Sequence, residues 1–550
     1  GMVAPDIPTL GFWLSVAGIA ACAWLIFLVL FDAGSPAGGL AAGLLIPIAP
    51  GLVLAFGLET GLYLALAFAA IVLYFRDHIV SAYVLLALLT LTRNDGVLLA
   101  AILSLDLAIK SLRGVPHTRS GTLHAARALA RPLVGYLLVL VPWFAFAWLY
   151  YSTPFPFTLT AKIAQAQSGL WPAFFQGWLA WVMDWAVGFW PIALLALIGV
   201  VIAVRRRSRL LLVGAWGLAH VAGYSSLGVA YYAWYVAPHL VALLLFAGLG
   251  ADWVARRLAA AIRVPVAATP VTLLIVLPLL VLEWNANLAA GMQSPSPKLQ
   301  VYRQAAAWLA QNTPSYAIVD ALEVGVIGYY DARPTVDFVG LVDPGRVPFT
   351  RARDFAGGVR QAAADYVVKI PPDEWLPVDA WFVSNYRPVH EIRLAGFYSG
   401  KPLVIYERLG RGVPLPEIWP VHLSFDRSVF LSQVDTASTV VRPGDAVPML
   451  LHLQRAGDAG LDENAKITIQ LVGTADQVAA QIDTPLPWRS LSDGRPHLDR
   501  QVLRIPSQAA PGEYRLILAV YNSESGERQS VYDENREVGD FIALGNVTIK

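Results

Sequence analysis

The chain has 550 residues, of which 56% are hydrophobic and only 14% are charged, and its formal net charge is +1. That composition is unusual for a soluble protein and typical of a chain that crosses a membrane several times. The first 290 residues hold 15 Lys and Arg against 9 Asp and Glu, which leaves 25 basic and 30 acidic residues in the remainder. An acidic second half argues against nucleic acid as a partner, because phosphate backbones are bound by clustered cations.

Long apolar runs follow one another through the first half of the chain. Most of them approach the roughly 20 residues that a helix needs to cross a bilayer. The first run is not a cleavable signal peptide, since no basic region precedes it. Together the runs predict about ten transmembrane segments, at residues 9–31, 37–56, 59–75, 79–92, 94–109, 133–151, 185–204, 210–228, 231–250 and 265–284.

Basic residues predict how these segments are oriented, because cytoplasmic loops are enriched in Lys and Arg. Arg76 and Lys110 both belong to such loops, so the residues between them must form a hairpin whose tip, Arg93, faces outward. Further basic groups lie at 113–131, 205–209 and 256–263. This assignment places the 151–184 loop, the 229–235 turn and everything after residue 284 outside the cytoplasm.

Two cations, Arg93 and Lys162, are expected on the outer face against this orientation signal, and the carboxylates Glu59 and Asp95 are expected near them. Ionisable groups at membrane depth are candidates for function. Aromatic residues and a histidine of the same face are candidates for a substrate or lipid groove: Trp171, Tyr232, Trp234, Tyr235 and His239. Alternatives stay open for each group. The acids can be helix caps or partners of a helix dipole, and the cations can be headgroup anchors. The aromatic residues can form an interface belt, and the histidine can be a core residue.

The second half of the chain predicts two further domains. Helical and strand patterns alternate between residues 291 and 410, which indicates a small α/β domain with a helix at 298–312. A Gly- and Pro-rich linker at 410–416 follows, and short alternating strands from 419 to 550 predict an antiparallel β-sandwich. We therefore expect a transmembrane domain at 1–290, an α/β domain at 291–410 and a β-sandwich at 419–550, the last two outside the cytoplasm.

Several short segments resemble the motifs of a known family of bacterial integral-membrane proteins. Residues 57–63 (GLETGLY) and 91–96 (LTRNDG) resemble its SGLET-aromatic and LTRPEG segments. Residues 154–162 (PFPFTLTAK) resemble its outer loop, 234–238 (WYVAP) its WYxxP helix, and 324–341 its GxIGYY…D(L/F)xGL pattern. The resemblance covers residues 50–410 and is to the GT-C class of integral-membrane glycosyltransferases, whose mannosyl- and arabinosyltransferase-like members use polyprenyl-phosphate sugars as donors.

The resemblance implies transfer of a sugar from a polyprenyl-phosphate donor to a glycan, lipid or protein acceptor at the outer face of a bacterial cell membrane. Arg93 and Lys162 would bind the donor phosphate, since Arg holds phosphate oxygens in a fork and Lys supplies a point charge. Glu59 and Asp95 would be the catalytic carboxylates, holding the acceptor or orienting Arg93. Two carboxylates are too few ligands to specify a metal, so no cofactor is assigned and a divalent cation stays an alternative.

The sequence also departs from the family pattern. Asn94 and Asp95 replace the usual Pro-Glu, which keeps the carboxylate. The family carries its catalytic acid in a first outer loop, and only Asp6 lies near that end, so we expect the N-terminal helix and that loop to be missing from this chain. Two alternatives of other classes remain: a transporter or flippase of lipid-linked sugars, and a non-catalytic glycan-binding membrane protein.

Overall fold

The computed structural model describes residues 7–550 except 114–118, 155, 262–267, 290–295, 316, 363, 372–381, 383–385, 409–416, 437–438, 457–462, 488–490 and 492–496. By their internal contacts the residues divide into two compact units, 1–294 and 295–550. Asp6 and the predicted linker at 410–416 lie outside the described residues.

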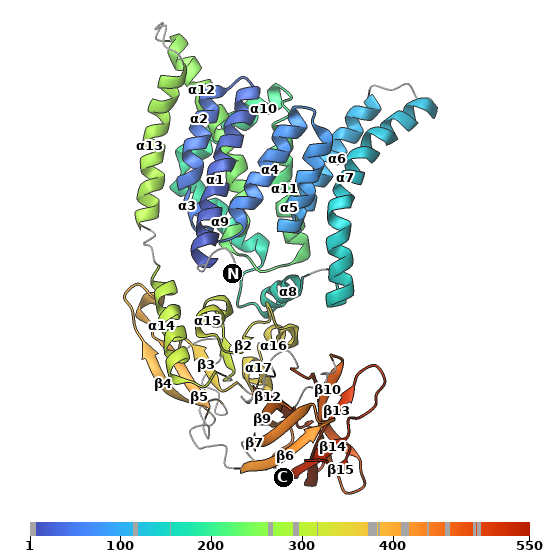
Figure 1. Cartoon of the computed structure of the whole chain (residues 1–550). Helices are drawn as coiled ribbons and strands as arrows, with labels where there is room; N and C mark the ends of the chain where they lie inside the picture. Colours follow the sequence, from blue (N-terminus) through green and yellow to red (C-terminus); the bar gives the residue numbers. More distant parts are fainter. Residues whose placement is uncertain are drawn as a thin grey trace. The chain divides into compact units, whose positions relative to one another are not determined.

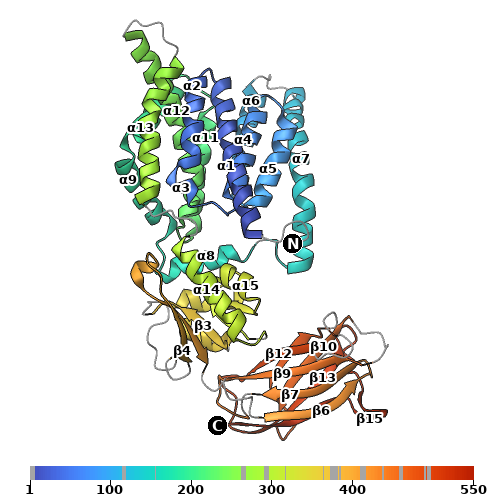
Figure 2. The same cartoon turned by 60° about the vertical axis from the view of Figure 1, so that its left-hand side comes forward.

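The first unit is a bundle of helices, several of which run side by side in both views of Figures 1 and 2. Helix α1 packs on α4, α5 on α7, and α10 on α12. The helices are α1 (Ile7–Asp32), α2 (Pro36–Leu45), α3 (Pro50–Val53), α4 (Thr60–Phe75), α5 (Ile79–Thr92), α6 (Gly96–Arg113), α7 (Arg119–Tyr151), α8 (Thr158–Ser168), α9 (Phe174–Gly188), α10 (Trp190–Arg205), α11 (Leu211–Leu227), α12 (Ala237–Ala261) and α13 (Ala268–Ala289), with the 3-10 turns η1 (Ile46–Ile48) and η2 (Ala233–Val236).

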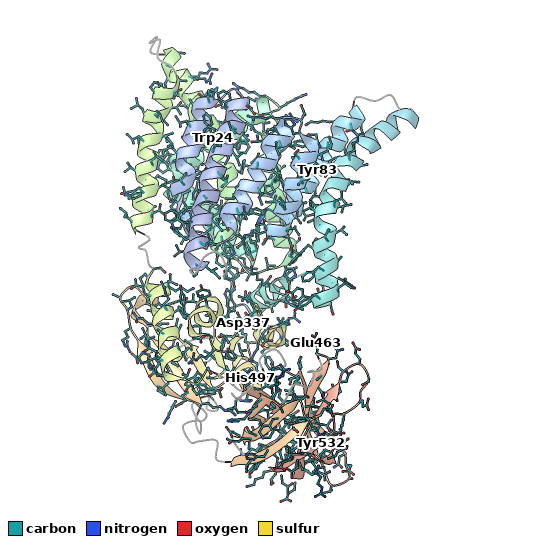
Figure 3. The ribbon with its side chains drawn as sticks, in the orientation of Figure 1. Trp24, Tyr83, Asp337, Glu463, His497 and Tyr532 are labelled. Atoms are coloured by element: carbon teal, nitrogen blue, oxygen red, sulfur yellow. The ribbon has the colours of Figure 1, made fainter. Side chains whose placement is uncertain are left out.

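Glycines allow two of these helix pairs to approach closely. A Cβ at Gly199 of α10 would lie 1.9 Å from the carbonyl oxygen of Phe246 in α12. A Cβ at Gly61 of α4 would lie 2.4 Å from the carbonyl oxygen of Ser15 in α1. In lipid there is no hydrophobic driving force between helices, so small residues at such crossings favour association by allowing close van der Waals packing. The bundle also has polar contacts. The hydroxyl of the buried Tyr83 of α5, which is labelled in Figure 3, lies 2.8 Å from that of Ser104.

The structure has fewer long spans than the sequence predicts. Within the described residues, four helical stretches are long and apolar enough to cross a membrane, at 7–32, 129–151, 233–261 and 268–289. The pair α9 and α10, bent by 104° at its break, would make a fifth. The predicted segment at 37–56 is wrong as a single helix, because Pro47 and Pro50 interrupt it and α2 ends at Leu45. An apolar helical unit is therefore present, but the count of about ten spans is not confirmed.

Charged residues separate into two groups at opposite ends of the helices. At one end, Arg76 pairs with Asp32, and Arg209 donates to the carbonyl of Phe75. At the same end, the Arg256 side chain donates to the carbonyl of Gly34, in the turn that follows Asp32. Arg93 and Lys162 lie at the other end of these helices, because α5 runs from the first end to the turn that holds Arg93, and both cations contact Tyr235. The basic groups that predicted orientation are thus gathered as expected, while the side of the membrane that each end faces stays a prediction.

The second unit begins with a mixed α/β fold that contains Asp337 (Figure 3). Its five-stranded sheet has the order β2-β1-β3-β5-β4, in which β1 is parallel to β2 and β3 while β5 is antiparallel to both its neighbours. A core formed by helices α14 and α15 and the sheet includes Tyr302, Ile327 and Ile405. The elements are α14 (Pro297–Asn312), β1 (Val319–Ala321), α15 (Val324–Asp331), β2 (Thr335–Asp337), η3 (Pro344–Arg346), α16 (Val347–Ala352), α17 (Phe355–Ala362), β3 (Tyr366–Lys369), β4 (Tyr386–Ile392), η4 (Tyr398–Gly400) and β5 (Leu403–Arg408).

The rest of the second unit is β-rich and consists of two sheets. One has the order β11-β10-β13-β16-β8 and the other β12-β9-β7-β6-β14-β15. Alternate residues of both sheets, such as Leu451 and Leu518, enter one hydrophobic core, which is how two sheets form a sandwich. The strands are β6 (Glu417–Phe425), β7 (Val429–Thr436), β8 (Val440–Val441), β9 (Ala446–Arg455), β10 (Ala465–Val472), β11 (Val478–Pro485), β12 (His497–Arg504), β13 (Gly512–Asn522), β14 (Val531–Asp533), β15 (Arg536–Gly539) and β16 (Ile542–Ile549).

Candidate functional site

The centre of the site is the short turn between α5 and α6. Helix α5 ends at Thr92, and the backbone of Arg93 is extended, with φ −149° and ψ 130°. The amide of Gly96 donates to the carbonyl of Arg93, and a Cβ at Gly96 would lie 2.8 Å from the backbone of Leu89. Glycine therefore allows α6 to start against the end of α5, and this tight turn directs Arg93 and Asp95 into one cluster.

The guanidinium of Arg93 is contacted on several sides, and its side chain is only 9% exposed. Its Nη2 lies 3.0 Å from Asp95 Oδ2, and its Nε lies 3.4 Å from Asp95 Oδ1. Nη2 also donates to the hydroxyl of Tyr224 at 3.2 Å. The rings of Tyr63 and Tyr235 lie 5.2 and 5.5 Å from the guanidinium carbon, within the range of cation–π attraction.

Asp95 is an anchor for these groups and is fully engaged. Its Oδ2 accepts from Arg93, from the Tyr224 hydroxyl at 2.7 Å and from His220 Nε2 at 3.0 Å. Burial disfavours the charged carboxylate, but Arg93 and the hydrogen bond from His220 outweigh it and hold the pKa of Asp95 well below its usual range. A carboxylate that binds a proton this weakly and has its oxygens occupied is poorly suited to be a general base.

Glu59 is the second carboxylate, and its setting is different. It stands at the N-cap of α4 but makes no cap hydrogen bond. Its Oε1 lies 3.4 Å from Arg93 Nη1, and its side chain is 48% exposed. An exposed pair at this distance contributes about 0–1 kcal/mol, so Glu59 is held loosely while Asp95 is held firmly.

Lys162 of α8 supplies the second cation of the cluster. Its Nζ lies 4.9 Å from the centre of the Tyr235 ring and 5.6 Å from that of Tyr232. Tyr232 in turn donates to Gln165 Oε1 at 2.6 Å, one turn further along α8. Burial, and after it the positive charge of Arg93, lower the pKa of the Lys162 ammonium to about 8.

Backbone contacts fix the position of Lys162 against the 229–235 turn. The Ala230 amide donates to the Lys162 carbonyl at 3.0 Å, and the Phe174 amide donates to the Val229 carbonyl at 2.8 Å. Gly177 makes room for Tyr231, since a Cβ there would lie 2.3 Å from that ring. These contacts join α8 and the start of α9 to the 229–235 turn, and Tyr235 of that turn contacts both Lys162 and Arg93.

The remaining predicted residues take different positions. Trp234 stacks on Tyr232, with ring centres 4.5 Å apart. His239 is 6% exposed and lies behind the cluster, with its ring 4.9 Å from that of His220. Trp171 is half-buried in the loop between α8 and α9. The structure therefore brings Glu59, Arg93, Asp95, Lys162, Tyr232, Trp234 and Tyr235 into one cluster, with His239 in the layer beneath it.

Sequence reasoning missed three side chains that complete the cluster. His220 and Tyr224 lie four residues apart on α11, so they occupy one face of an otherwise apolar helix. That spacing was the available signal, because polar groups repeated at i and i+4 in a membrane helix are rarely accidental. Gln165 was the third, three residues after Lys162 and on the same side of α8. In the described part of the chain, no three His, Cys, Asp or Glu side chains are grouped so as to hold a metal ion.

Comparisons with known proteins add two findings. A family model described as a domain of unknown function (DUF8728) matches residues 290–406. A solved structure, that of ArnT from Cupriavidus metallidurans in the apo state, is similar to the chain with a TM-score of 0.44 and 13% identity, over 72% of this chain and 83% of that one. No curated protein matches. The function proposed below therefore rests on the residues of the site itself.

Proposed function

We propose that the protein is a membrane glycosyltransferase that moves a sugar from a polyprenyl-phosphate donor to an acceptor at the outer face of the membrane. The observation that carries the proposal is the pair of cations Arg93 and Lys162. The Arg93 guanidinium carbon lies 5.5 Å and the Lys162 Nζ 4.9 Å from the centre of the Tyr235 ring. Both cations lie at the end of the helices opposite to Arg76 and Arg209. Two cations gathered beside apolar helices suit the phosphate of a lipid-linked substrate.

The two cations are suited to different parts of this task. Asp95 holds Nε and Nη2 of Arg93, which orients the guanidinium and leaves Nη1 on the side of the exposed Glu59. A phosphate oxygen can replace Glu59 at Nη1 without disturbing the Asp95 contacts. Lys162, which contacts the same Tyr235 ring, would add a point charge. Together they would stabilise the charge that develops on the leaving phosphate as its bond to the sugar breaks.

The aromatic rings and apolar helices favour a lipid-linked donor over a soluble one. Tyr232 and Trp234 are stacked beside Lys162, and aromatic residues at a membrane surface bind both sugar faces and lipid headgroup regions. We assign Glu59 to the acceptor and Asp95 to the positioning of Arg93. This assignment differs from the sequence-based expectation that both carboxylates are catalytic.

Release of polyprenyl phosphate tests the proposal directly. The full chain in lipid nanodiscs would be given decaprenyl- and undecaprenyl-phosphate sugars labelled in the sugar, with mannose and arabinose among them. We expect release of polyprenyl phosphate that is lost in Lys162→Met and kept in Lys110→Met, whose lysine pairs with Asp106 at the other end of the helices. Binding without release would favour a glycan-binding protein, transfer of the intact lipid across the bilayer would favour a transporter, and absence of donor binding would overturn the proposal.

A further inference from the structure

We propose that the donor phosphate displaces Glu59 from Arg93, and that the carboxylate so freed takes the proton of the acceptor hydroxyl. This inference rests on the proposed function and adds to it a base and an order of binding. Donor binding would then create the catalytic base, so the donor must bind before the acceptor can react.

The first step of the argument is the distribution of the Arg93 hydrogen bonds. A guanidinium has five N–H groups in a fixed plane. Nε and Nη2 are committed to Asp95 and Tyr224, which are themselves buried or half-buried. Nη1 faces Glu59, the more exposed of the two acids. An incoming anion therefore meets the Nη1 side of Arg93, and the group that it meets there is the Glu59 carboxylate.

The second step concerns how weakly Glu59 is held. Its contact to Nη1 is 3.4 Å long, whereas Asp95 approaches Nη2 to 3.0 Å. The segment before it is a turn with Gly57 at φ +89°, and Glu59 makes no cap hydrogen bond to α4. Neither helix α4 nor a second described hydrogen bond has to be broken when the carboxylate turns away. Two anions cannot share Nη1 without repulsion, so a bound phosphate favours that movement.

The third step is the chemistry that the freed carboxylate can perform. The bond between the anomeric carbon and the phosphate oxygen breaks, and its electron pair leaves with polyprenyl phosphate, which Arg93 and Lys162 hold. The acceptor oxygen forms the new bond to the anomeric carbon, and its proton passes to a Glu59 oxygen. Once the phosphate has replaced it at Nη1, the half-exposed Glu59 carboxylate has no described hydrogen-bond partner left and its oxygens can accept that proton. Asp95 keeps its arginine, histidine and tyrosine partners throughout.

The test compares donor binding with turnover in Glu59→Gln. Removing the competing anion should lower the dissociation constant of decaprenyl phosphate by about two- to five-fold, which corresponds to the free energy of an exposed ion pair. Loss of a positioned base should lower the rate of sugar transfer by about 10²–10⁴-fold. Opposite effects on binding and turnover are not expected from a structural defect. The matched control is Asp77→Asn, an exposed acid 3.9 Å from Arg209 at the opposite end, which should change neither quantity.

Two further measurements make the outcome decisive. Amide exchange at residues 54–60 should change when decaprenyl phosphate is added to the wild type and should not change in Arg93→Lys, because a single ammonium cannot hold Asp95 and also take the place of Nη1. Inhibition by polyprenyl phosphate should be competitive with the donor alone. If decaprenyl phosphate binds the wild type but Glu59→Gln neither tightens it nor slows transfer, the inference is overturned while the proposed function stands. If the wild type binds no polyprenyl phosphate, the proposed function itself fails.

Discussion

Replacing Lys162 by methionine isolates the electrostatic part of donor binding. The ammonium lies over the rings of Tyr232 and Tyr235, and no described carboxylate lies within ion-pair distance of it. Removing its charge therefore leaves no buried acid without a partner, and folding should be little affected. A hydrogen bond to a charged group contributes about 1.5–3 kcal/mol, so the dissociation constant of the donor should rise about 10- to 150-fold. Arg93→Ala would be a poorer test, because it strands the buried Asp95 at a cost of about 3–5 kcal/mol.

The same lysine predicts a pH dependence whose sign can be worked out. Burial and Arg93 lower the pKa of Lys162 to about 8, so in the free protein the ammonium loses its proton as the pH rises above that value. A bound phosphate favours the charged form, and affinity should therefore be constant below about pH 7 and fall by up to about tenfold per pH unit above 8. The assay is fluorescence or scintillation binding of a decaprenyl-phosphate sugar, a phosphodiester that does not itself titrate in this range.

Two variants serve as controls for this prediction. Lys162→Met should bind weakly at every pH and lose the slope above pH 8, and Lys162→Arg should restore part of the affinity without the slope. Lys110→Met, far from the site, should behave as the wild type. The reasoning fails if Lys162→Met keeps wild-type affinity, or if the slope above pH 8 persists in it.

Three further predictions concern other parts of the chain. Asp95→Asn should weaken donor binding and also lower the melting temperature, because Arg93 and His220 lose a shared charged acceptor; unchanged melting would show that this network is not structural. Burial raises the pKa of Asp320 to about 7, so between pH 4 and 7 the folded unit holds a proton there that the unfolded chain releases. The free energy of unfolding should therefore fall by up to about 4 kcal/mol between pH 4 and 7 and level off above pH 7. Amide exchange of β1 measures this change, and Asp320→Asn should flatten the profile. Single cysteines can be placed against a background in which the sole Cys22 is buried: a cysteine at 162 should react from outside intact cells and one at 206 should not, and the reverse result would invert the orientation.

Part of the candidate site could be predicted from the sequence because it depends on local signals. Arg93 and Lys162 stood out since they break the charge rule that orients membrane helices. Glu59 and Asp95 were found because the same predicted topology places them near these cations on the outer face. His220 and Tyr224 were missed, because the sequence of α11 predicts an apolar helix but does not predict which neighbouring segment its few polar side chains contact. That partner was chosen by packing between α11 and the α5–α6 turn.

The sequence by itself determined the division into an apolar helical half and a β-rich half, and the gathering of basic residues at one end of the helices. These features follow from composition and periodicity, which act over a few neighbouring residues. Only the tertiary structure decided which carboxylate is held firmly and which is held loosely. Asp95 and Glu59 are both acids beside one arginine, and their difference arises from burial and from two partners on a distant helix. Burial and partners are properties of the packed chain, so no local pattern could have separated the firmly held carboxylate from the loosely held one.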